Sequence, residues 1–448
     1  MTGIILCGAA FLLGLLAGNR SLRLGICAVI SVGYGYGIVR ANVADQWTYI
    51  IFDAVVVGLF LSQLWRPMTS EQRRATQDLR LWVGLLIGWP TLLFILSPAS
   101  QPLVELVGLR ANVFLLPFLV LGARLEEADL ESLAIVLAYL NIGAVALGTV
   151  QFFVGLEPFF PRNEVTEIIY KSRDLVGFTA YRIPASFSSA HAFAGTLAMT
   201  LPLLVGVWMR PQPPSERWRT TLLAVAIVAS LVGVFMAAAR THMVITALLV
   251  ATVTLSGQLR RRQWVRWAVA VGLVAYIVAG NARFQRFTTL QDTSGVTERI
   301  AGSVNEEFFD LVTEHPLGRG LANGGTSVPF FLQAPLDQPR ILENEYARIA
   351  LEQGLPGLGL WLGFIVWVIT RRPGRRKDDW VLARRLALVS AAAVFATGLF
   401  GMGMLVSVPQ TVLMLTTLGW AVAIRRPAVV LERRPARTRS LTNLAESP

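Results

Sequence analysis

Cysteine and histidine are scarce in this sequence. The two cysteines, Cys7 and Cys27, lie in apolar stretches, and the three histidines, His191, His242 and His315, are scattered along the chain. This content does not indicate a disulfide framework, and no H-E-x-x-H or C-x-x-C spacing indicates a zinc site. The sequence therefore predicts neither a bound metal ion nor another cofactor.

Charged residues are also few, at 15% of the chain, and the longest polar stretches are 155–185 and 281–341. By contrast, 54% of the residues are hydrophobic and the mean hydropathy is +0.56. A soluble domain of this length would not need so much apolar surface, because its core saturates. We therefore expect residues 1–448 to form a single membrane domain with no separate soluble domain.

Apolar runs long enough to cross a bilayer recur along the whole chain, which is typical of a polytopic membrane protein. We predict an all-α transmembrane helical bundle of about 12 or 13 spans, of which the fifth is short. Their approximate positions are 3–18, 23–39, 48–65, 79–97, 111–123, 130–154, 186–209, 220–238, 242–258, 264–280, 345–370, 381–403 and 406–424.

The net charge of +12 is unevenly distributed along the chain. Most of the 40 basic residues, all but two of which are arginine, cluster in alternate loops: 66–80, 210–219, 260–266, 371–385 and the tail 425–448. The positive-inside rule assigns these loops to the cytoplasm, so that the first outer loop, 155–185, and the large loop, 281–341, face the other side. Basic loops of this kind indicate anionic membrane lipid, and not nucleic acid, as their partner.

Two arginines are expected at the outer surface. Arg240 lies in the turn between the spans at 220–238 and 242–258, with no acidic residue nearby in the sequence. Arg182 precedes Pro184, and Ser186 or a later serine would cap the next helix, whose positive dipole end favours an anion beside Arg182. The alternatives are a snorkelling Arg240 and ordinary loop-to-helix chemistry around Arg182.

The stretch "ILENEYARIALEQGLPG" (341–357) carries several charges at the start of a predicted span. Asn344, Arg348 and Glu352 share one helical face, with Glu345 three residues before Arg348. We interpret Arg348 and Glu352 as a structural ion pair. Glu343 at the helix start is either an acidic residue stabilised by the helix dipole or a general base.

The same span contains features that interrupt a helix. Gly354 and Pro356 predict a kink, because proline removes a backbone hydrogen bond and glycine weakens the helix. Non-helical backbone at membrane depth is tolerated only inside protein or beside water, so we expect a cavity near the outer surface. Asp53, Asn141 and Gln151 are further polar residues at membrane depth. Asp53 has no cation nearby in the sequence and is interpreted mainly as a structural hydrogen bonder.

Four motifs together resemble the O-antigen ligase and O-antigen polymerase superfamily. "ENEYARIALEQGLPG" (343–357) is similar to its signature, "EHPLGRGLANGG" (314–325) to its His-Pro stretch, and "RIPASFSSAHAFA" (182–194) and "AAARTHMVITALL" (237–249) to its arginine-containing segments. The order and spacing match from about residue 180 to 360, whereas the first 150 residues are similar only in being multi-span. Ligases of the superfamily have histidine where this chain has Glu343, which favours a repeat-unit polymerase.

The resemblance implies an enzyme of the bacterial inner membrane with its active site facing the periplasm. It would transfer glycan from an undecaprenyl-diphosphate carrier to a sugar hydroxyl, with inversion and without metal. Arg182 and Arg240, with Arg348 as a third, would bind the diphosphate, and Glu343 would act as base. Asn344, His315 and Tyr346 would contact substrate, and loop 281–341 would cover the site. A chain-length regulator is a further possible partner.

Three alternatives stay open from the sequence. The first is a ligase that transfers finished glycan to lipid A core or to protein. The second is a flippase or secondary transporter, although transporters carry charge at the bilayer midplane and here the charges lie near one surface. The third is a membrane scaffold for polysaccharide assembly.

Overall fold

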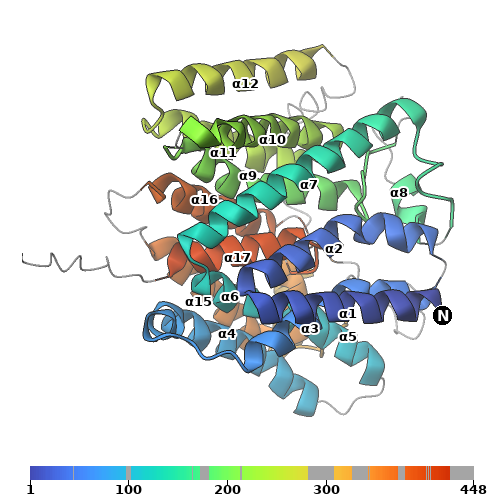
Figure 1. Cartoon of the computed structure of the whole chain (residues 1–448). Helices are drawn as coiled ribbons and strands as arrows, with labels where there is room; N and C mark the ends of the chain where they lie inside the picture. The colour runs from blue at the N-terminus through green and yellow to red at the C-terminus, as the bar shows by residue number, and fades with distance from the viewer. Residues whose placement is uncertain are drawn as a thin grey trace, which may run out of the picture.

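The computed structural model describes residues 1–43, 45–96, 102–163, 165–171, 181–211, 214–280, 307–324, 342, 344–371, 379–399, 401, 403 and 405–423. Within these ranges the secondary structure is helical and contains no strand (Figure 1). The elements are α1 (Thr2–Arg20), α2 (Leu22–Asn42), η1 (Gln46–Ile50), α3 (Ile51–Leu64), α4 (Ser70–Leu96), α5 (Pro102–Val113), α6 (Pro117–Arg124), α7 (Glu127–Val154), α8 (Glu167–Lys171), α9 (Ala190–Met209), η2 (Pro214–Glu216), α10 (Arg217–Met236), α11 (Arg240–Leu255), α12 (Arg261–Ala279), α14 (Glu307–Glu314), α15 (Glu345–Thr370), α16 (Val381–Thr397) and α17 (Gln410–Val422).

The predicted all-α architecture is confirmed. Among the described residues, nine helical segments are long and apolar enough to cross a membrane. The fifth predicted span is longer than expected, because α5 and α6 together form one segment, Pro102–Arg124. The predicted spans that are not among these nine segments correspond to α11, α12, α16 and α17. Of these helices, α11 and α17 have only 16 and 13 residues. Most of the predicted loop 281–341 and the tail 425–448 lie outside the described residues.

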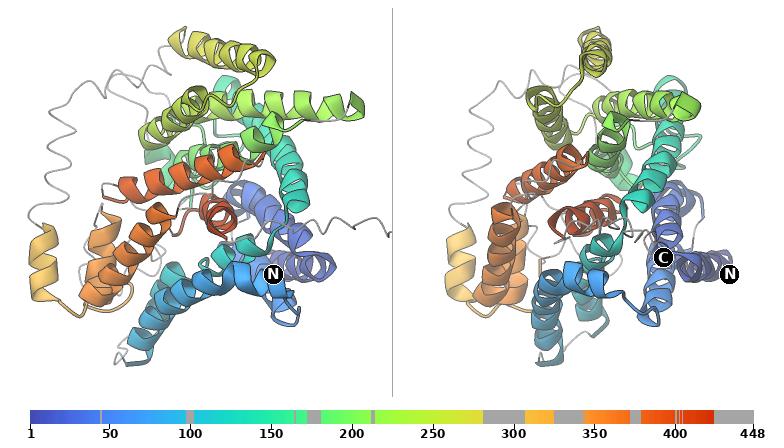
Figure 2. Two further views of the ribbon diagram at one scale, coloured as in Figure 1. Left: turned by 90° about the vertical axis from the view of Figure 1, so that its left-hand side faces the viewer. Right: turned by 60° about the vertical axis from the view of Figure 1, so that its left-hand side comes forward.

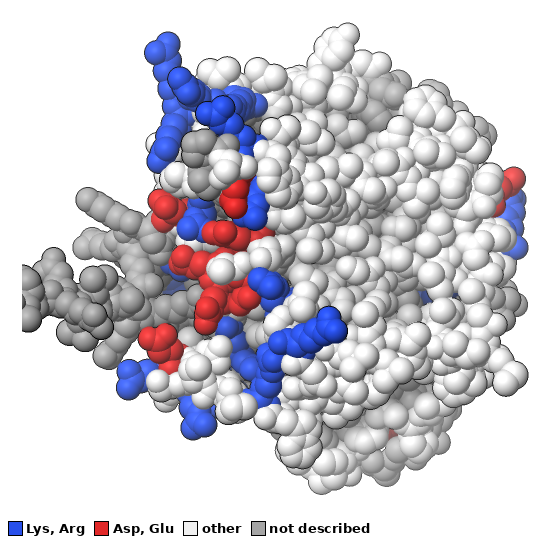
Figure 3. Space-filling view, in the orientation of Figure 1, with Lys and Arg blue, Asp and Glu red and all other residues white. Residues whose placement is uncertain are grey.

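Charged side chains gather at one end of the bundle. Figure 3 shows most of the visible basic and acidic side chains at the left, where α4 and α7 begin, and a wide uncharged belt beside them. We call this the basic end. The opposite end, at which α9, α11, α15 and α17 begin, is called the distal end. An uncharged belt between two polar ends is the surface that a bilayer requires.

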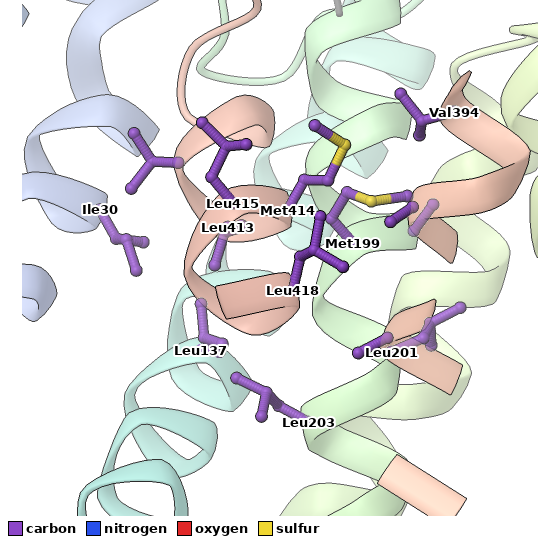
Figure 4. Close-up of a cluster of buried hydrophobic side chains, with 14 of the residues drawn as sticks. Ile30, Leu137, Met199, Leu201, Leu203, Val394, Leu413, Met414, Leu415 and Leu418 are labelled. Atoms are coloured by element: carbon purple, nitrogen blue, oxygen red, sulfur yellow. The ribbon is translucent and has the colours of Figure 1, made fainter. Parts of the chain in front are cut away.

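The short helix α17 is the centre of the packed core. Every one of its residues is buried, and it contacts α6, α9 and α16 (Figure 2). Figure 4 shows its leucines and Met414 between side chains of α2, α7 and α9. Gly419 faces the Leu119 carbonyl so closely that an added Cβ would lie 2.0 Å from the oxygen. Close approach at small residues is how membrane helices gain packing energy.

Polar residues inside the bundle join helices that are distant in sequence. Asn141 of α7 accepts a hydrogen bond from Tyr34 at 2.5 Å and donates to Thr200 and Ser230 at 2.8 Å each. These bonds connect α7 to α2, α9 and α10, and such bonds are worth roughly 0.6 kcal/mol each on average. Asn141 therefore has a structural role in the bundle.

Asp53 likewise has a structural partner. It forms a two-pronged ion pair with Arg110 of α5, with Arg110 Nε 2.7 Å and Nη2 2.5 Å from its carboxylate oxygens. The cation is 57 residues away in the chain, which is why no local partner was visible in the sequence.

Candidate functional site at the distal end

The segment before α9 positions Arg182. Ser189 caps α9 by accepting a hydrogen bond from the Ala192 N–H at 3.1 Å, so the cap is one of the later serines that the sequence allowed. Arg182 Nη1 lies 3.3 Å from Nε2 of His191, the second residue of the helix. The guanidinium is therefore placed beside the positive end of the α9 dipole.

Neighbouring helices hold this segment from two sides. The Gln151 side chain of α7 donates to the Ala185 carbonyl at 2.7 Å, and Ala185 has a φ of 52°. The Ile38 N–H of α2 donates to the Ser186 carbonyl at 3.0 Å. Gly37 lies so close to Phe187 that a Cβ there would be 2.0 Å from the backbone. These contacts fix the path of the chain between Arg182 and α9.

Arg240 lies in the tight turn that the sequence predicted. Helix α10 ends at Met236, Ala238 has a φ of 52°, and Arg240 is the first residue of α11. The Arg240 side chain is half-buried. Its Nε is fully buried, and among the described residues no group hydrogen-bonds to it. A guanidinium with a buried, unsatisfied N–H at a helix N-terminus is suited to bind an anion.

Two histidines connect the arginines in space. The ring of His191 lies 6.4 Å from the ring of His242, which follows Arg240 by two residues in α11. His242 is buried, and its Nε2 and the Gln410 side-chain oxygen at the start of α17 both lie close to Gly195. The Gln410 oxygen accepts a hydrogen bond from Ser407 at 3.1 Å. We call Arg182, His191, Arg240, His242 and Gln410 the Arg–His cluster.

Sequence reasoning named the arginines of this cluster and missed its other members. The histidines are 51 positions apart, and Gln410 lies 168 positions beyond His242, so no spacing signal could join them. A glycine shows how closely they meet: a Cβ on Gly195 would lie 1.9 Å from the Gln410 oxygen and 2.7 Å from His242 Nε2.

The start of α15 is fixed by its cap. Asn344 accepts hydrogen bonds from the Tyr346 and Ala347 N–H groups at 2.9 and 3.2 Å. The Glu345 N–H donates to the Gly398 carbonyl at 2.8 Å, which ties α15 to the end of α16. Glu343, the predicted base, lies outside the described residues.

Arg348 is the centre of a buried ionic network. Its guanidinium lies 2.6 Å from both Glu345 and Glu352, and it donates to Asn112 of α5 at 3.1 Å. Asn112 in turn donates to Glu352 at 2.8 Å and accepts from Gln353 at 2.9 Å. The Arg348–Glu352 ion pair inferred from the sequence is confirmed. The guanidinium binds the two carboxylates and Asn112.

Tyr346 lies in the first turn of α15, and His315 lies directly after α14. The buried Tyr346 hydroxyl donates to the Phe395 carbonyl of α16 at 2.7 Å. His315 follows α14, and its carbonyl accepts the Gly318 N–H at 2.9 Å. Among the described residues, no hydrogen bond, ion pair or ring contact joins Arg348, Tyr346 or His315 directly to the Arg–His cluster. The predicted site residues therefore fall into two groups, one at α9 and α11 and the other around α15.

The kink in α15 is present, but protein fills the space beside it. Gly354 has a φ of 71°, and a Cβ on it would lie 2.4 Å from the Leu317 backbone. The Leu355 N–H donates to the Pro316 carbonyl at 2.8 Å, and the Arg319 N–H to the Leu351 carbonyl at 2.6 Å. Backbone of the 315–319 segment therefore packs directly against the kink, and the cavity expected near the outer surface stays a prediction.

In comparisons with known proteins, no family model matches the sequence and no curated protein sequence is significantly similar to it. Within the described ranges, no three His, Cys, Asp or Glu residues are grouped so that they could hold a metal ion. The apolar helices and the segregated charges define a multi-pass α-helical membrane protein. Its distal end carries arginines beside the N-termini of α9 and α11.

Proposed function

We propose that the protein is a glycosyltransferase of the O-antigen ligase and polymerase superfamily, which polymerises glycan repeat units carried on undecaprenyl diphosphate. The observation that carries the proposal is the Arg–His cluster. In it, contacts through His191 and His242 connect Arg182 to the first turn of α11, where Arg240 lies. The resemblance of four ordered motifs supports the same assignment.

The chemistry of the donor requires such a cluster. The acceptor hydroxyl oxygen attacks the anomeric carbon, and the bond from that carbon to the diphosphate oxygen breaks. The electron pair leaves with the diphosphate, and the hydroxyl proton passes to the Glu343 carboxylate. Negative charge grows on the leaving group, and guanidinium groups stabilise it by charge-assisted, bidentate hydrogen bonds. The N-termini of α9 and α11 add two positive dipole ends.

The orientation in the membrane follows from the distribution of charge. The positive-inside rule assigns the basic end to the cytoplasm and the distal end to the opposite side, which in the bacterial inner membrane implied by the resemblance is the periplasm. The lipid tail of the donor would then lie among the helices, with its diphosphate at the Arg–His cluster and its glycan projecting outward.

In this proposal the α15 network has a supporting role. The charge of Arg348 is balanced by two carboxylates, so it contributes little positive field to a ligand. It instead fixes the first turns of α15, and Asn344 fixes the helix start. Glu343 immediately precedes that start, so a rigid α15 would hold the base in position.

Reconstitution tests the proposed function. Purified protein in liposomes is supplied with undecaprenyl-diphosphate-linked oligosaccharide, without an ion gradient, and the products are sized. A ladder of extended carrier-linked glycan is the predicted result. The Glu343→Gln variant should bind the carrier lipid yet form no ladder, because the amide cannot accept the hydroxyl proton.

Other outcomes separate the alternatives. A single transfer to lipid A core or to a protein acceptor, without a ladder, would identify a ligase. Movement of the carrier lipid between leaflets without any new glycosidic bond would identify a transporter and would refute glycosyl transfer.

A further inference from the structure

Arg40, in the last turn of α2, is held on aromatic rings. Its guanidinium carbon lies 4.4 Å from the ring centre of Tyr49 in η1 and 5.7 Å from that of Tyr36. Tyr36 donates its hydroxyl to the Tyr49 carbonyl at 2.9 Å, and its ring packs against Phe52 at 6.2 Å. The aromatic surface is thus fixed before any ligand arrives.

No carboxylate of the described residues lies within ion-pair distance of Arg40, whereas Arg110, Arg162 and Arg348 toward the same end each have one. Arg110 pairs with Asp53, Arg162 with Glu157, and Arg348 with Glu345 and Glu352. Arg40 also lies at the distal end, where the positive-inside rule predicts few basic residues. Stacking on a ring leaves the N–H edge of the guanidinium available for a planar, bidentate anion.

Arg40 belongs to the same end of the bundle as the Arg–His cluster. One turn before it, α2 touches the segment that leads into α9, through the Ile38–Ser186 hydrogen bond and the contact of Gly37 with Phe187. That segment joins Arg182 to His191. Lower on the same helix, Gly33 packs against Pro409, directly before Gln410. The helix bearing Arg40 therefore lies against two segments that build the cluster.

We propose that Arg40, oriented by Tyr49 and Tyr36, is a further phosphate-binding residue of this protein. It would contact the diphosphate of the lipid-linked donor from the α2 side, opposite the arginines at α9 and α11. The inference rests on the proposed function, because that function supplies the diphosphate. A phospholipid headgroup offers the same chemistry and is the competing source of the phosphate.

The test is a binding measurement with undecaprenyl diphosphate as the probe. Wild type, Arg40→Gln, Arg40→Lys and Tyr49→Leu are compared in phosphatidylcholine nanodiscs, with and without phosphatidylglycerol. Arg162→Gln is the matched control, because Arg162 is an exposed arginine with a carboxylate partner. Arg40→Gln should weaken diphosphate binding roughly 10- to 100-fold in both lipids. Arg40→Lys and Tyr49→Leu should weaken it less, and Arg162→Gln should match wild type.

Three results would overturn the inference. Diphosphate binding by Arg40→Gln equal to wild type removes Arg40 from the site. Full binding by Arg40→Lys shows that only its charge at the helix C-terminus matters. A loss confined to nanodiscs with phosphatidylglycerol identifies a headgroup anchor instead. If wild type binds diphosphate and forms the glycan ladder, these results refute the role of Arg40 alone. Failure of wild type in both assays refutes the proposed function as well.

Discussion

Arg348 illustrates how a charge is accommodated inside this bundle. Its side chain is 3% exposed and those of Glu345 and Glu352 are 2% and 0% exposed. An isolated charge at this depth would be costly, but the two carboxylates and Asn112 meet its hydrogen-bonding needs. Removing one partner leaves a buried, uncompensated charge, which costs far more than the intact network gains.

Glu352→Gln should therefore act on stability. We expect a loss of about 3–5 kcal/mol, seen as lower abundance in the membrane and a lower melting temperature in detergent. Glu157→Gln is the control, because the Glu157–Arg162 pair is 65% and 63% exposed and its loss should change stability little. Normal abundance of Glu352→Gln with lost transfer would contradict the structural role.

Sequence spacing predicted only the local part of each site. The i, i+4 relation indicated that Arg348 and Glu352 would meet, whereas Asn112, 236 positions from Arg348, left no signal. In the Arg–His cluster the arginines were visible as charges next to apolar spans. Gln410 was not, because its meeting with His242 depends on how α9, α11 and α17 pack.

At the scale of the element, α15 shows how a broken helix is stabilised. Gly354 takes a left-handed conformation, and the backbone of 316–318 enters the space that a side chain would need. Hydrogen bonds from Arg319 and Leu355 complete the junction. The sequence predicted the kink from Gly354 and Pro356. It could not show what would fill the kink, since the filling segment comes from a different part of the chain.

Gly354→Ala should separate this junction. The new Cβ would lie 2.4 Å from the backbone of Leu317, and the alanine would have to adopt a strained positive φ. We therefore expect the free energy of unfolding to fall by about 1–3 kcal/mol or more. Protease cleavage within 315–324 should accelerate. Gly359→Ala, in the same helix with nothing within 4 Å of the new Cβ, should be neutral or stabilising by up to about 1 kcal/mol. Equal stability of the two variants would show that the junction contributes nothing.

At the scale of the whole molecule, the apolar runs predicted where the helices lie along the chain, because each run reports bilayer thickness directly. The alternating basic loops agree with the gathering of charge at one end (Figure 3). The packing order was not predictable from the same signal. Helices that all face lipid or each other are apolar on every side, so composition does not reveal that α17 lies at the centre (Figure 2).

The central claim is that arginines gathered at the distal end bind a lipid diphosphate, and mapping where that lipid lies tests it most directly. A photoreactive analogue of undecaprenyl diphosphate is crosslinked to the protein in nanodiscs, and the labelled peptides are identified by mass spectrometry. The account predicts labelling near Arg182–His191 and Arg240–His242 that free undecaprenyl diphosphate competes away. Arg240→Lys should abolish that labelling, because a point charge cannot replace the bidentate guanidinium. Competable labelling confined to the basic end, or unchanged in Arg240→Lys, would contradict it.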